Sequence, residues 1–401
     1  MNHFSRRHFL QFASAAFATL GIHPLVFQRQ ARRYGQALAE STPRKLALLV
    51  GINSYADQPL QGCVNDTELQ RQLLIHRFGF NPKDIYILSD KEATREGILT
   101  AFEEHLIKQA KPGDIVVYHY SGHGSRIFDP EPILRGVGNT PQLNGTFVPV
   151  DGTLPAGYPD VGGSVKDIMG HTLFLLKSAL QTEKVTVILD SCFAGGATRD
   201  VRFRSRDGGR NILVSPEERA YQEWWLSYLD MSPEEFVNGY RTGVAKGIAL
   251  AAAAPNQLAR EQNINGFQAG IFTYLLTHYL WHKDSNIDQI FKKITPEIPS
   301  YFRQVPRYEV KVGSGYQLEN PYFVETPNSP AQATVIGVSG KDARLWLGGV
   351  DLRKVGAGTV FEAVGDAGRV RVVSRDGIVA AATLENAVTV GTPLQLSVEA
   401  S

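Results

Sequence analysis

Short apolar runs of strand length alternate with helical segments through most of this chain, and this alternation constrains the fold more than any other feature. The runs are continuous rather than alternating in polarity, and they lie at 45–52, 84–88, 114–120, 184–190 and 247–254. The segments with helical spacing lie at 69–78, 94–109, 171–181, 272–281 and 287–298. Continuous apolar runs are typical of strands buried on both faces. We therefore expect an α/β domain over 40–325, with a mainly parallel sheet and helices on both faces.

Composition and charge are those of an ordinary globular protein. The chain has 401 residues, of which 43% are hydrophobic and 20% are charged, enough for one large domain and a small one. The formal net charge is +1, so no global field would draw the protein onto nucleic acid or an acidic membrane. Two cysteines are too few for a disulfide scaffold.

The carboxyl-terminal part of the chain has a different pattern. A linker-like stretch at 326–330 is followed by short strand-like segments separated by Gly and Asp turns. Closely spaced short strands favour a small all-β domain, and we expect a barrel-like one over 335–401. The domain contains no His or Cys, so no chemistry is assigned to it.

The amino terminus has the layout of an export signal. Arg6-Arg7 precede an apolar run that reaches about Phe27, and the small residues Ala37-Leu38-Ala39 follow. The paired arginines resemble the twin-arginine class, so residues 1–39 are expected to direct export to the periplasm or an equivalent compartment. A basic amphipathic start or a membrane anchor is the alternative. The run is broken by Gly21 and Pro24 and is short for a span.

Two polar motifs follow two of the expected strands at the point where each strand ends. Tyr120-Ser121-Gly122-His123-Gly124 ends the run at 114–120, and Asp190-Ser191-Cys192 ends the run at 184–190. The carboxyl ends of neighbouring parallel strands meet at one sheet edge. Either motif alone could be a turn with a capping histidine or a strand end with a buried thiol. Together they predict thiol catalysis, with Cys192 as nucleophile and His123 as its proton-transfer partner.

Glycines around the two motifs allow close approach of backbone to a bound peptide. The backbone amides of Gly124 and Cys192 are the expected donors to an oxyanion.

Four motifs, in order over residues 45–324, resemble those of the caspase superfamily, in particular its metacaspase and bacterial orthocaspase branch. They are Gly62-Cys63-Val64-Asn65-Asp66, Tyr120–Gly124, Asp190–Cys192, and 253–261 with 270–273. Phe193-Ala194-Gly195 departs from the His-Ser-Gly that is common after the metacaspase cysteine. The resemblance implies a cysteine endopeptidase that cleaves peptide bonds after Arg or Lys.

The resemblance also implies which residues bind the basic side chain of the substrate. Asp66, Ser121 and Asp190 map onto the family's pocket, and Cys63 belongs to the same early motif. Asp190 lies two residues before Cys192 and so shares a strand face with it, while Asp66 should open a helix at the same sheet edge. Two carboxylates in one pocket favour a cation. A plain helix N-cap is the alternative role for Asp66.

No cofactor is expected to be required. Many members of the branch need calcium, but the acidic residues of the matching loops are scattered rather than densely spaced, namely Asp129, Glu131, Asp151, Asp160 and Asp200. These residues are better explained as solvated loop charges, and no metal ligand is assigned.

Five arginines lie shortly after Cys192, and they are candidate sites of self-cleavage: Arg199, Arg202, Arg204, Arg206 and Arg210. Members of the family commonly cut themselves in this part of the chain, here within the long stretch 197–246. A solvated basic loop is the alternative.

Two other functions stay open at this point. One is a caspase-fold hydrolase or transferase of another specificity, and the other is a pseudoenzyme scaffold whose β domain recruits a partner. The expected partners are protein or peptide substrates with a basic residue before the scissile bond, and not nucleic acid. Oligomeric state is not determined by these patterns.

Overall fold

The structure is a computed structural model, and it describes residues 43–128, 143–192, 204–206, 208–282, 285–324 and 330–399. The chain divides into two units, 1–44 and 45–401. The expected export signal at 1–39 lies outside the described residues. Within the described ranges no helix is both long and apolar enough to cross a membrane.

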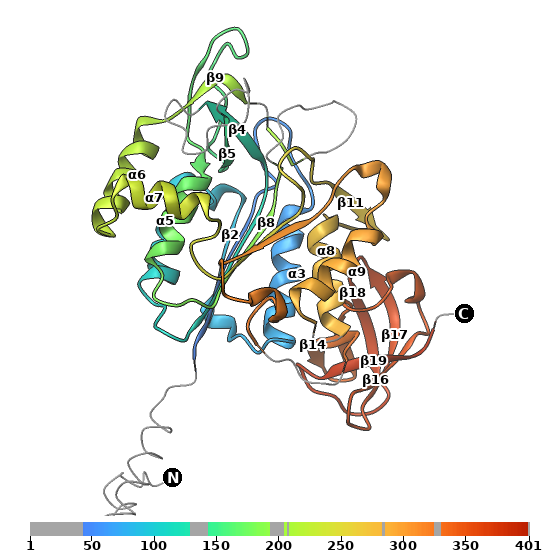
Figure 1. Cartoon of the computed structure of the whole chain (residues 1–401). Helices are drawn as coiled ribbons and strands as arrows, with labels where there is room; N and C mark the ends of the chain where they lie inside the picture. The colour runs from blue at the N-terminus through green and yellow to red at the C-terminus, as the bar shows by residue number, and fades with distance from the viewer. Residues whose placement is uncertain are drawn as a thin grey trace, which may run out of the picture. The chain divides into compact units, whose positions relative to one another are not determined.

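A six-stranded sheet forms the centre of the larger unit (Figure 1). Its strands, in spatial order, are β13 (Arg307–Val310), β10 (Ile248–Ala251), β8 (Val185–Asp190), β3 (Ile115–Ser121), β1 (Lys45–Gly51) and β2 (Ile85–Ser89). All neighbours pair in parallel except β13, which is antiparallel to β10. The expected mainly parallel sheet is confirmed.

Alternate residues of the central strands pack into two separate cores, one on each face of the sheet. In β1, Ala47 and Leu49 belong to one cluster, and Leu46, Leu48 and Val50 belong to the other. Successive side chains of a strand point to opposite faces, so a strand in the middle of a two-faced sheet must be apolar throughout. This explains the continuous apolar runs of the sequence.

Helices cover both faces of this sheet, with α3, α8 and α9 on one side and α5, α6 and α7 on the other (Figure 1). The α-helices are α3 (Cys63–His76), α4 (Arg95–Ala101), α5 (Gly170–Ala179), α6 (Pro216–Tyr228), α7 (Pro233–Arg241), α8 (Ile271–His282) and α9 (Ile287–Glu297). A π-helical segment, η3 (Phe102–Ile107), continues α4. Short 3₁₀ turns are η1 (Pro82–Asp84), η2 (Asp90–Glu92), η4 (Ser300–Phe302), η5 (Tyr316–Leu318) and η6 (Leu352–Lys354). The Thr94 side chain caps α4, as its position in the sequence predicts.

A second sheet takes four of its five strands from 124–169 and the fifth from 209–214. Its strands, in spatial order, are β6 (Gly163–Val165), β9 (Gly209–Val214), β4 (Gly124–Phe128), β5 (Leu143–Phe147) and β7 (Ile168–Met169). These strands are short, and β4, β5 and β6 are only partly buried, so they leave no clear period in the sequence.

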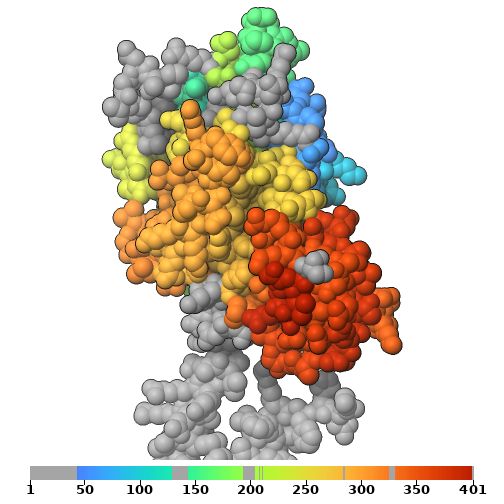
Figure 2. All heavy atoms as spheres, turned by 90° about the vertical axis from the view of Figure 1, so that its right-hand side faces the viewer, coloured from blue at the N-terminus to red at the C-terminus, as the bar shows by residue number. Residues whose placement is uncertain are grey.

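The carboxyl-terminal strands close into a six-stranded antiparallel barrel, so the expected barrel-like domain is present. In order around the barrel they are β14 (Ala333–Ser339), β15 (Asp342–Trp346), β18 (Val379–Leu384), β17 (Arg369–Asp376), β16 (Val360–Ala363) and β19 (Pro393–Val398). Figure 2 shows the barrel residues gathered in one body, coloured red. Its inner residues share an apolar cluster with α8. The amide of Ala331 donates to the carbonyl of Trp281 at 3.3 Å.

Candidate active site

The two polar motifs of the sequence meet at one edge of the central sheet. Ser121, the last residue of β3, pairs in register with Asp190, the last residue of β8. His123 and Cys192 follow two residues further along each strand. Parallel pairing of β3 with β8 therefore brings the thiol segment and the imidazole segment together, as their positions in the sequence predict.

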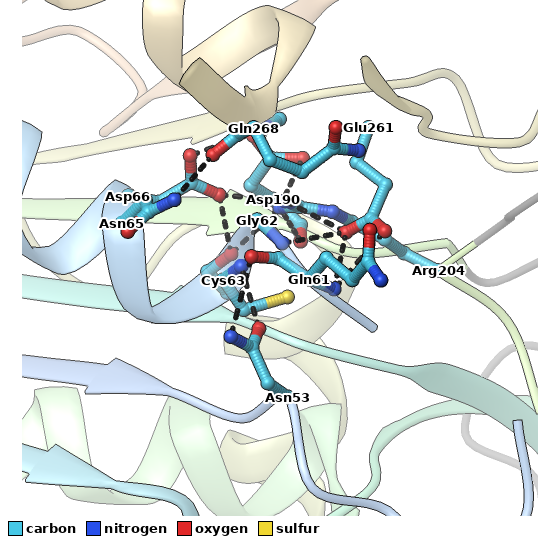
Figure 3. Close-up of polar contacts among 12 residues, drawn as sticks. Asn53, Gln61, Gly62, Cys63, Asn65, Asp66, Asp190, Arg204, Glu261 and Gln268 are labelled. Atoms are coloured by element: carbon cyan, nitrogen blue, oxygen red, sulfur yellow. Dashed lines mark hydrogen bonds and ion pairs between the residues drawn. The ribbon is translucent and has the colours of Figure 1, made fainter. Parts of the chain in front are cut away.

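The side chain of Arg204 lies in a fully buried acidic pocket beside these strand ends (Figure 3). Its Nη2 atom lies 2.7 Å from Oδ2 of Asp66, and its Nη1 atom lies 3.0 Å from Oδ1 of Asp190. Nη1 also donates to Ser121 Oγ at 2.6 Å and to the Asp190 carbonyl at 3.1 Å. A buried charge is tolerated when it is paired and hydrogen-bonded. The two ion pairs supply the counter-charge, and Nη1 makes the hydrogen bonds, whereas Nη2 contacts Asp66 as an ion pair only.

Backbone amides and hydroxyl groups donate hydrogen bonds to the carboxylates of Asp66 and Asp190. Asp66 Oδ1 accepts from the Gly270 amide at 2.9 Å, and Asp66 Oδ2 accepts from Ser121 Oγ at 2.7 Å. Asp190 Oδ2 accepts from the amide and the hydroxyl of Thr273, at 3.1 and 2.6 Å. Burial raises the pKa of Asp66 to about 7, although the neighbouring Arg204 guanidinium acts in the opposite direction.

Asp66 is not the N-cap of its helix, which was the alternative role for this residue. The helix α3 begins at Cys63 and has Gly62 as its N-cap, without a capping side chain. Its first amides are satisfied from elsewhere, because Asn53 Oδ1 accepts from Cys63 N and Glu261 accepts from Gly62 N, both at 2.9 Å. The Asp66 carboxylate is thereby left to face Arg204.

Glu261 is a third carboxylate at this pocket, and the sequence analysis assigned it no role. Its Oε2 atom lies 3.9 Å from Arg204 Nη2. It begins β11 (Glu261–Ile264), which pairs with β12 (Phe267–Gly270), and Glu261 faces Gly270 across the open end of this hairpin. The hairpin turn is Asn265-Gly266, with φ of 50° and 90°, the turn that such a dipeptide predicts. The Asn-Gly dipeptide was the signal in the sequence for this hairpin, which carries Glu261 at its open end.

The main chain of Arg204 is bound as closely as its side chain. Its carbonyl oxygen accepts from the amides of Gly124 and Cys192, each at 3.0 Å, and its own amide donates to the Ala259 carbonyl at 3.2 Å. The two amides expected to form an oxyanion hole thus converge on one carbonyl oxygen. The bond that follows this carbonyl joins Arg204 to Ser205.

Backbone and tyrosine contacts fix the orientation of His123. The His123 amide donates to Tyr55 Oη at 2.9 Å, and the two rings are 4.4 Å apart. Nε2 of His123 lies 2.7 Å from the Gln58 carbonyl. A carbonyl only accepts, so Nε2 carries a hydrogen and Nδ1 is the basic nitrogen of the neutral ring. Nδ1 is buried and has no hydrogen-bond partner among the described residues.

Both reactive groups are neutral with Arg204 in place. Burial lowers the pKa of His123 to about 4, the guanidinium groups of Arg206 and Arg204 act in the same direction, and the bond to Gln58 opposes them. Burial raises the pKa of the Cys192 thiol to about 12. The thiol contacts Ala259, donating to its carbonyl at 3.2 Å and accepting from its amide at 2.6 Å. Across the described part of the chain, no hydrogen bond joins His123 to Cys192.

The remaining candidate residues lie in several places. Cys63 is buried at the start of α3, and burial raises the pKa of its thiol, so it stays protonated. Its sulfur makes no hydrogen bond or ion pair to Arg204 in the described structure. Arg199 and Arg202 lie outside the described residues, and Arg210 is part of β9. Arg206 is buried beside Asp167.

No group of three or more His, Cys, Asp or Glu side chains in the described ranges could hold a metal ion. Asp151 accepts from the Arg95 amide at 2.8 Å and lies 3.3 Å from Lys166 Nζ, and Asp160 is exposed. The other acidic residues considered for calcium, at 129, 131 and 200, lie outside the described part. The expectation that no cofactor is required stays a prediction.

A thiol and an imidazole at adjacent ends of a parallel sheet, with two converging amides, are the arrangement of a cysteine hydrolase. The sequence profile of the family described as "Caspase domain" matches residues 44–313, well over half of the chain. The protein therefore belongs to the caspase-domain family, as a cysteine peptidase of metacaspase type.

Similar proteins include metacaspases of fungi and plants. Metacaspase-1 of Schizosaccharomyces pombe is 26% identical over 300 residues, which are 66% of this chain and 66% of that protein. Metacaspase-1B of Neosartorya fischeri is 35% identical over 242 residues, 56% of this chain and 52% of that protein. Metacaspase-7 of Arabidopsis thaliana is 35% identical over 158 residues, 38% of this chain and 35% of that protein. The matches thus span about one third to two thirds of these relatives.

Proposed function

We propose that this protein is an endopeptidase that cleaves after arginine, and less well after lysine, through Cys192 and His123, and that it cuts its own Arg204–Ser205 bond. One observation carries the proposal. The Arg204 side chain is held between Asp66 and Asp190 while its carbonyl accepts from the amides of Gly124 and Cys192. A substrate arginine would make the same contacts on both sides of its Cα atom.

The proposed reaction begins when the Cys192 thiol leaves Ala259 and gives its proton to Nδ1 of His123. The thiolate attacks the carbonyl carbon of Arg204, and the amides of Gly124 and Cys192 stabilise the negative charge on the oxygen. The carbon–nitrogen bond breaks as His123 returns the proton to the nitrogen of Ser205. Water then hydrolyses the thioester, giving a carboxylate on Arg204 and free Cys192.

Arginine is preferred to lysine because the pocket binds the two terminal nitrogens separately. Nη1 contacts Asp190 and Ser121, whereas Nη2 contacts Asp66. A lysine ammonium is a single point charge and cannot occupy both positions. Aspartate is excluded, because a fourth negative side chain would face the buried carboxylates of Asp66, Asp190 and Glu261 with no cation between them.

The test compares the wild type with Cys192→Ala and Arg204→Gln after incubation of each purified chain. Mass spectrometry should find a fragment that begins at Ser205 in the wild type and in neither variant. Arginyl, lysyl and aspartyl fluorogenic peptides, with calcium or a chelator, test cleavage in trans. Efficient hydrolysis after aspartate would refute the pocket assignment. An intact wild type that hydrolyses arginyl peptides would remove only the self-cleavage.

A further inference from the structure

The chain beyond Arg204 continues through the site in an extended path beside the start of β4. Ser205 pairs in parallel with Gly124, and the Arg206 amide donates to the Gly124 carbonyl at 2.9 Å. Gly124 thus binds the main chain on both sides of the Arg204–Ser205 bond. This pairing fixes where the second residue after the bond must lie.

Arg206, that second residue, inserts its side chain into another buried acidic position. Its Nη1 and Nη2 atoms donate to the two oxygens of Asp167 at 2.8 and 2.7 Å, a bidentate arrangement. Nη1 also donates to the Gly152 carbonyl at 2.5 Å. Asp167 is 1% exposed, and Thr146 Oγ1 donates to its Oδ2 at 2.6 Å.

The buried carboxylate of Asp167 requires a positively charged partner, and Arg206 of the extended segment 204–206 supplies it. Burial raises the pKa of the Asp167 carboxyl group above its usual value, and the Arg206 guanidinium acts in the opposite direction. A carboxylate buried without a counter-charge is costly. Thr146, Gly152 and Asp167, which contact each other or Arg206 here, all belong to 146–167.

Resting on the proposed function, we propose that Asp167 forms a second specificity pocket, which binds an arginine side chain two residues beyond the scissile bond. The protein then selects peptides of the pattern Arg-x-Arg and cleaves them after the first arginine. The pattern occurs in the chain at Arg202-Phe203-Arg204, Arg204-Ser205-Arg206 and Arg369-Val370-Arg371. In Arg204-Ser205-Arg206 the two arginine side chains contact Asp66 with Asp190 and Asp167, respectively.

The test uses the full chain with Arg206→Gln, whose own side chain no longer fills the Asp167 pocket. Two internally quenched peptides that differ only in one position, Arg-Ser-Arg and Arg-Ser-Gln, are compared by kcat/KM. We expect a ratio of about 30 to 4000 in favour of Arg-Ser-Arg, the range for one lost partner of a buried charge pair. Adding Asp167→Asn should bring the ratio to about one. Adding Asp160→Asn, which removes an exposed carboxylate of the same stretch, should leave the ratio unchanged.

A second measurement covers the case in which Arg206→Gln does not process itself. The fraction of chain cut after Arg204 should fall in the order wild type, Arg206→Lys, Arg206→Gln. Equal hydrolysis of the two peptides, or self-cleavage of Arg206→Gln as fast as the wild type, would overturn the Asp167 pocket and leave arginine specificity standing. Hydrolysis of neither peptide by any self-processed enzyme would overturn the proposed function and this inference with it.

Discussion

Arg204 is the residue around which the site is organised, because three carboxylates and a serine hydroxyl gather on its guanidinium. Figure 3 shows that these carboxylates come from separate parts of the chain. Asp66 lies in the first turn of α3, Asp190 ends β8, and Glu261 begins β11. If Arg204 leaves after cleavage, the pocket keeps its negative groups and is ready for another cation.

Asp190→Asn should lower kcat/KM for arginyl peptides by about 1.5 to 3.5 decades, since losing one partner of a desolvated charge pair costs about 2–5 kcal/mol. The effect should be smaller for lysyl peptides, which engage fewer of the pocket's acceptors. Steady-state kinetics on matched arginyl and lysyl peptides measures both. Asp342→Asn, on an exposed residue of the barrel, is the control. Unchanged arginyl kinetics in Asp190→Asn would contradict the pocket assignment.

The pH dependence of arginyl hydrolysis should have an acid limb that appears in KM. Asp66, with its pKa raised to about 7 by burial, takes up a proton as the pH falls, and the pocket then binds a cation less well. Departure of Arg204 removes a group that lowers this pKa, so the limb of the emptied pocket lies at or above that value. With an arginine in the pocket, burial and the neighbouring guanidinium groups lower the pKa of His123 to about 4, so the bound complex keeps His123 unprotonated over the same range.

The measurement is KM and kcat for one arginyl peptide between about pH 5 and pH 8. KM should rise as the pH falls through about 7, while kcat changes little. Asp66→Asn should bind the peptide weakly at every pH and show no such limb. A limb found in kcat alone would assign the titration to another group.

At the scale of elements, the β11–β12 hairpin completes the pocket that the strand ends begin. Glu261 and Gly270 are paired at its open end, and the Gly270 amide donates to Asp66. Gly270 lies so close to the pocket that a Cβ atom there would be 2.3 Å from Asp190 Oδ2 and 2.7 Å from Arg204 Nη1. Only glycine leaves room for an arginine side chain at this position.

Gly270→Ala should therefore abolish both arginyl hydrolysis and cleavage after Arg204, because the added methyl group enters the space of the guanidinium. Gly337→Ala in β14 is the control, since a Cβ atom there would meet nothing closer than Arg344 Cβ at 3.8 Å. Peptide kinetics and a thermal unfolding curve are measured for each variant. Wild-type kinetics in a folded Gly270→Ala protein would show that arginine binds elsewhere.

At the scale of the whole molecule, the Arg204–Ser205 bond lies between strands that pair with each other. β8 precedes the bond and β10 follows it, and the two are adjacent in the central sheet. In the second sheet, β4 precedes the bond and β9 follows it, and these two strands also pair with each other. Cutting the chain between them leaves these hydrogen bonds and the shared apolar core in place.

The self-cleaved protein should consequently remain a single particle. Size-exclusion chromatography under native conditions should elute both fragments together, at the position of uncut Cys192→Ala, whereas denaturing electrophoresis should separate them. Fragments that elute separately without denaturant would contradict this expectation and place most of the stabilising contacts within each fragment.

Local patterns in the sequence predicted most of the central sheet and the proximity of the two segments that carry His123 and Cys192. The continuous apolar runs predict buried parallel strands because side chains alternate between two apolar faces. The positions of His123 and Cys192 at two strand ends predict their proximity, because parallel strands present those ends at one edge. Only residues near one another in the chain were needed for these inferences.

Tertiary structure alone decided which arginine and which carboxylates the site uses. Five arginines after Cys192 look alike in the sequence, and only the pairing of Ser205 with Gly124 selects Arg204 for the Asp66–Asp190 pocket. Glu261 reaches the start of α3 across 200 residues. Asp167 lies in the connection between the short strands β6 and β7, where the sequence shows no period. Contacts across such separations depend on how the elements pack, which no local pattern records.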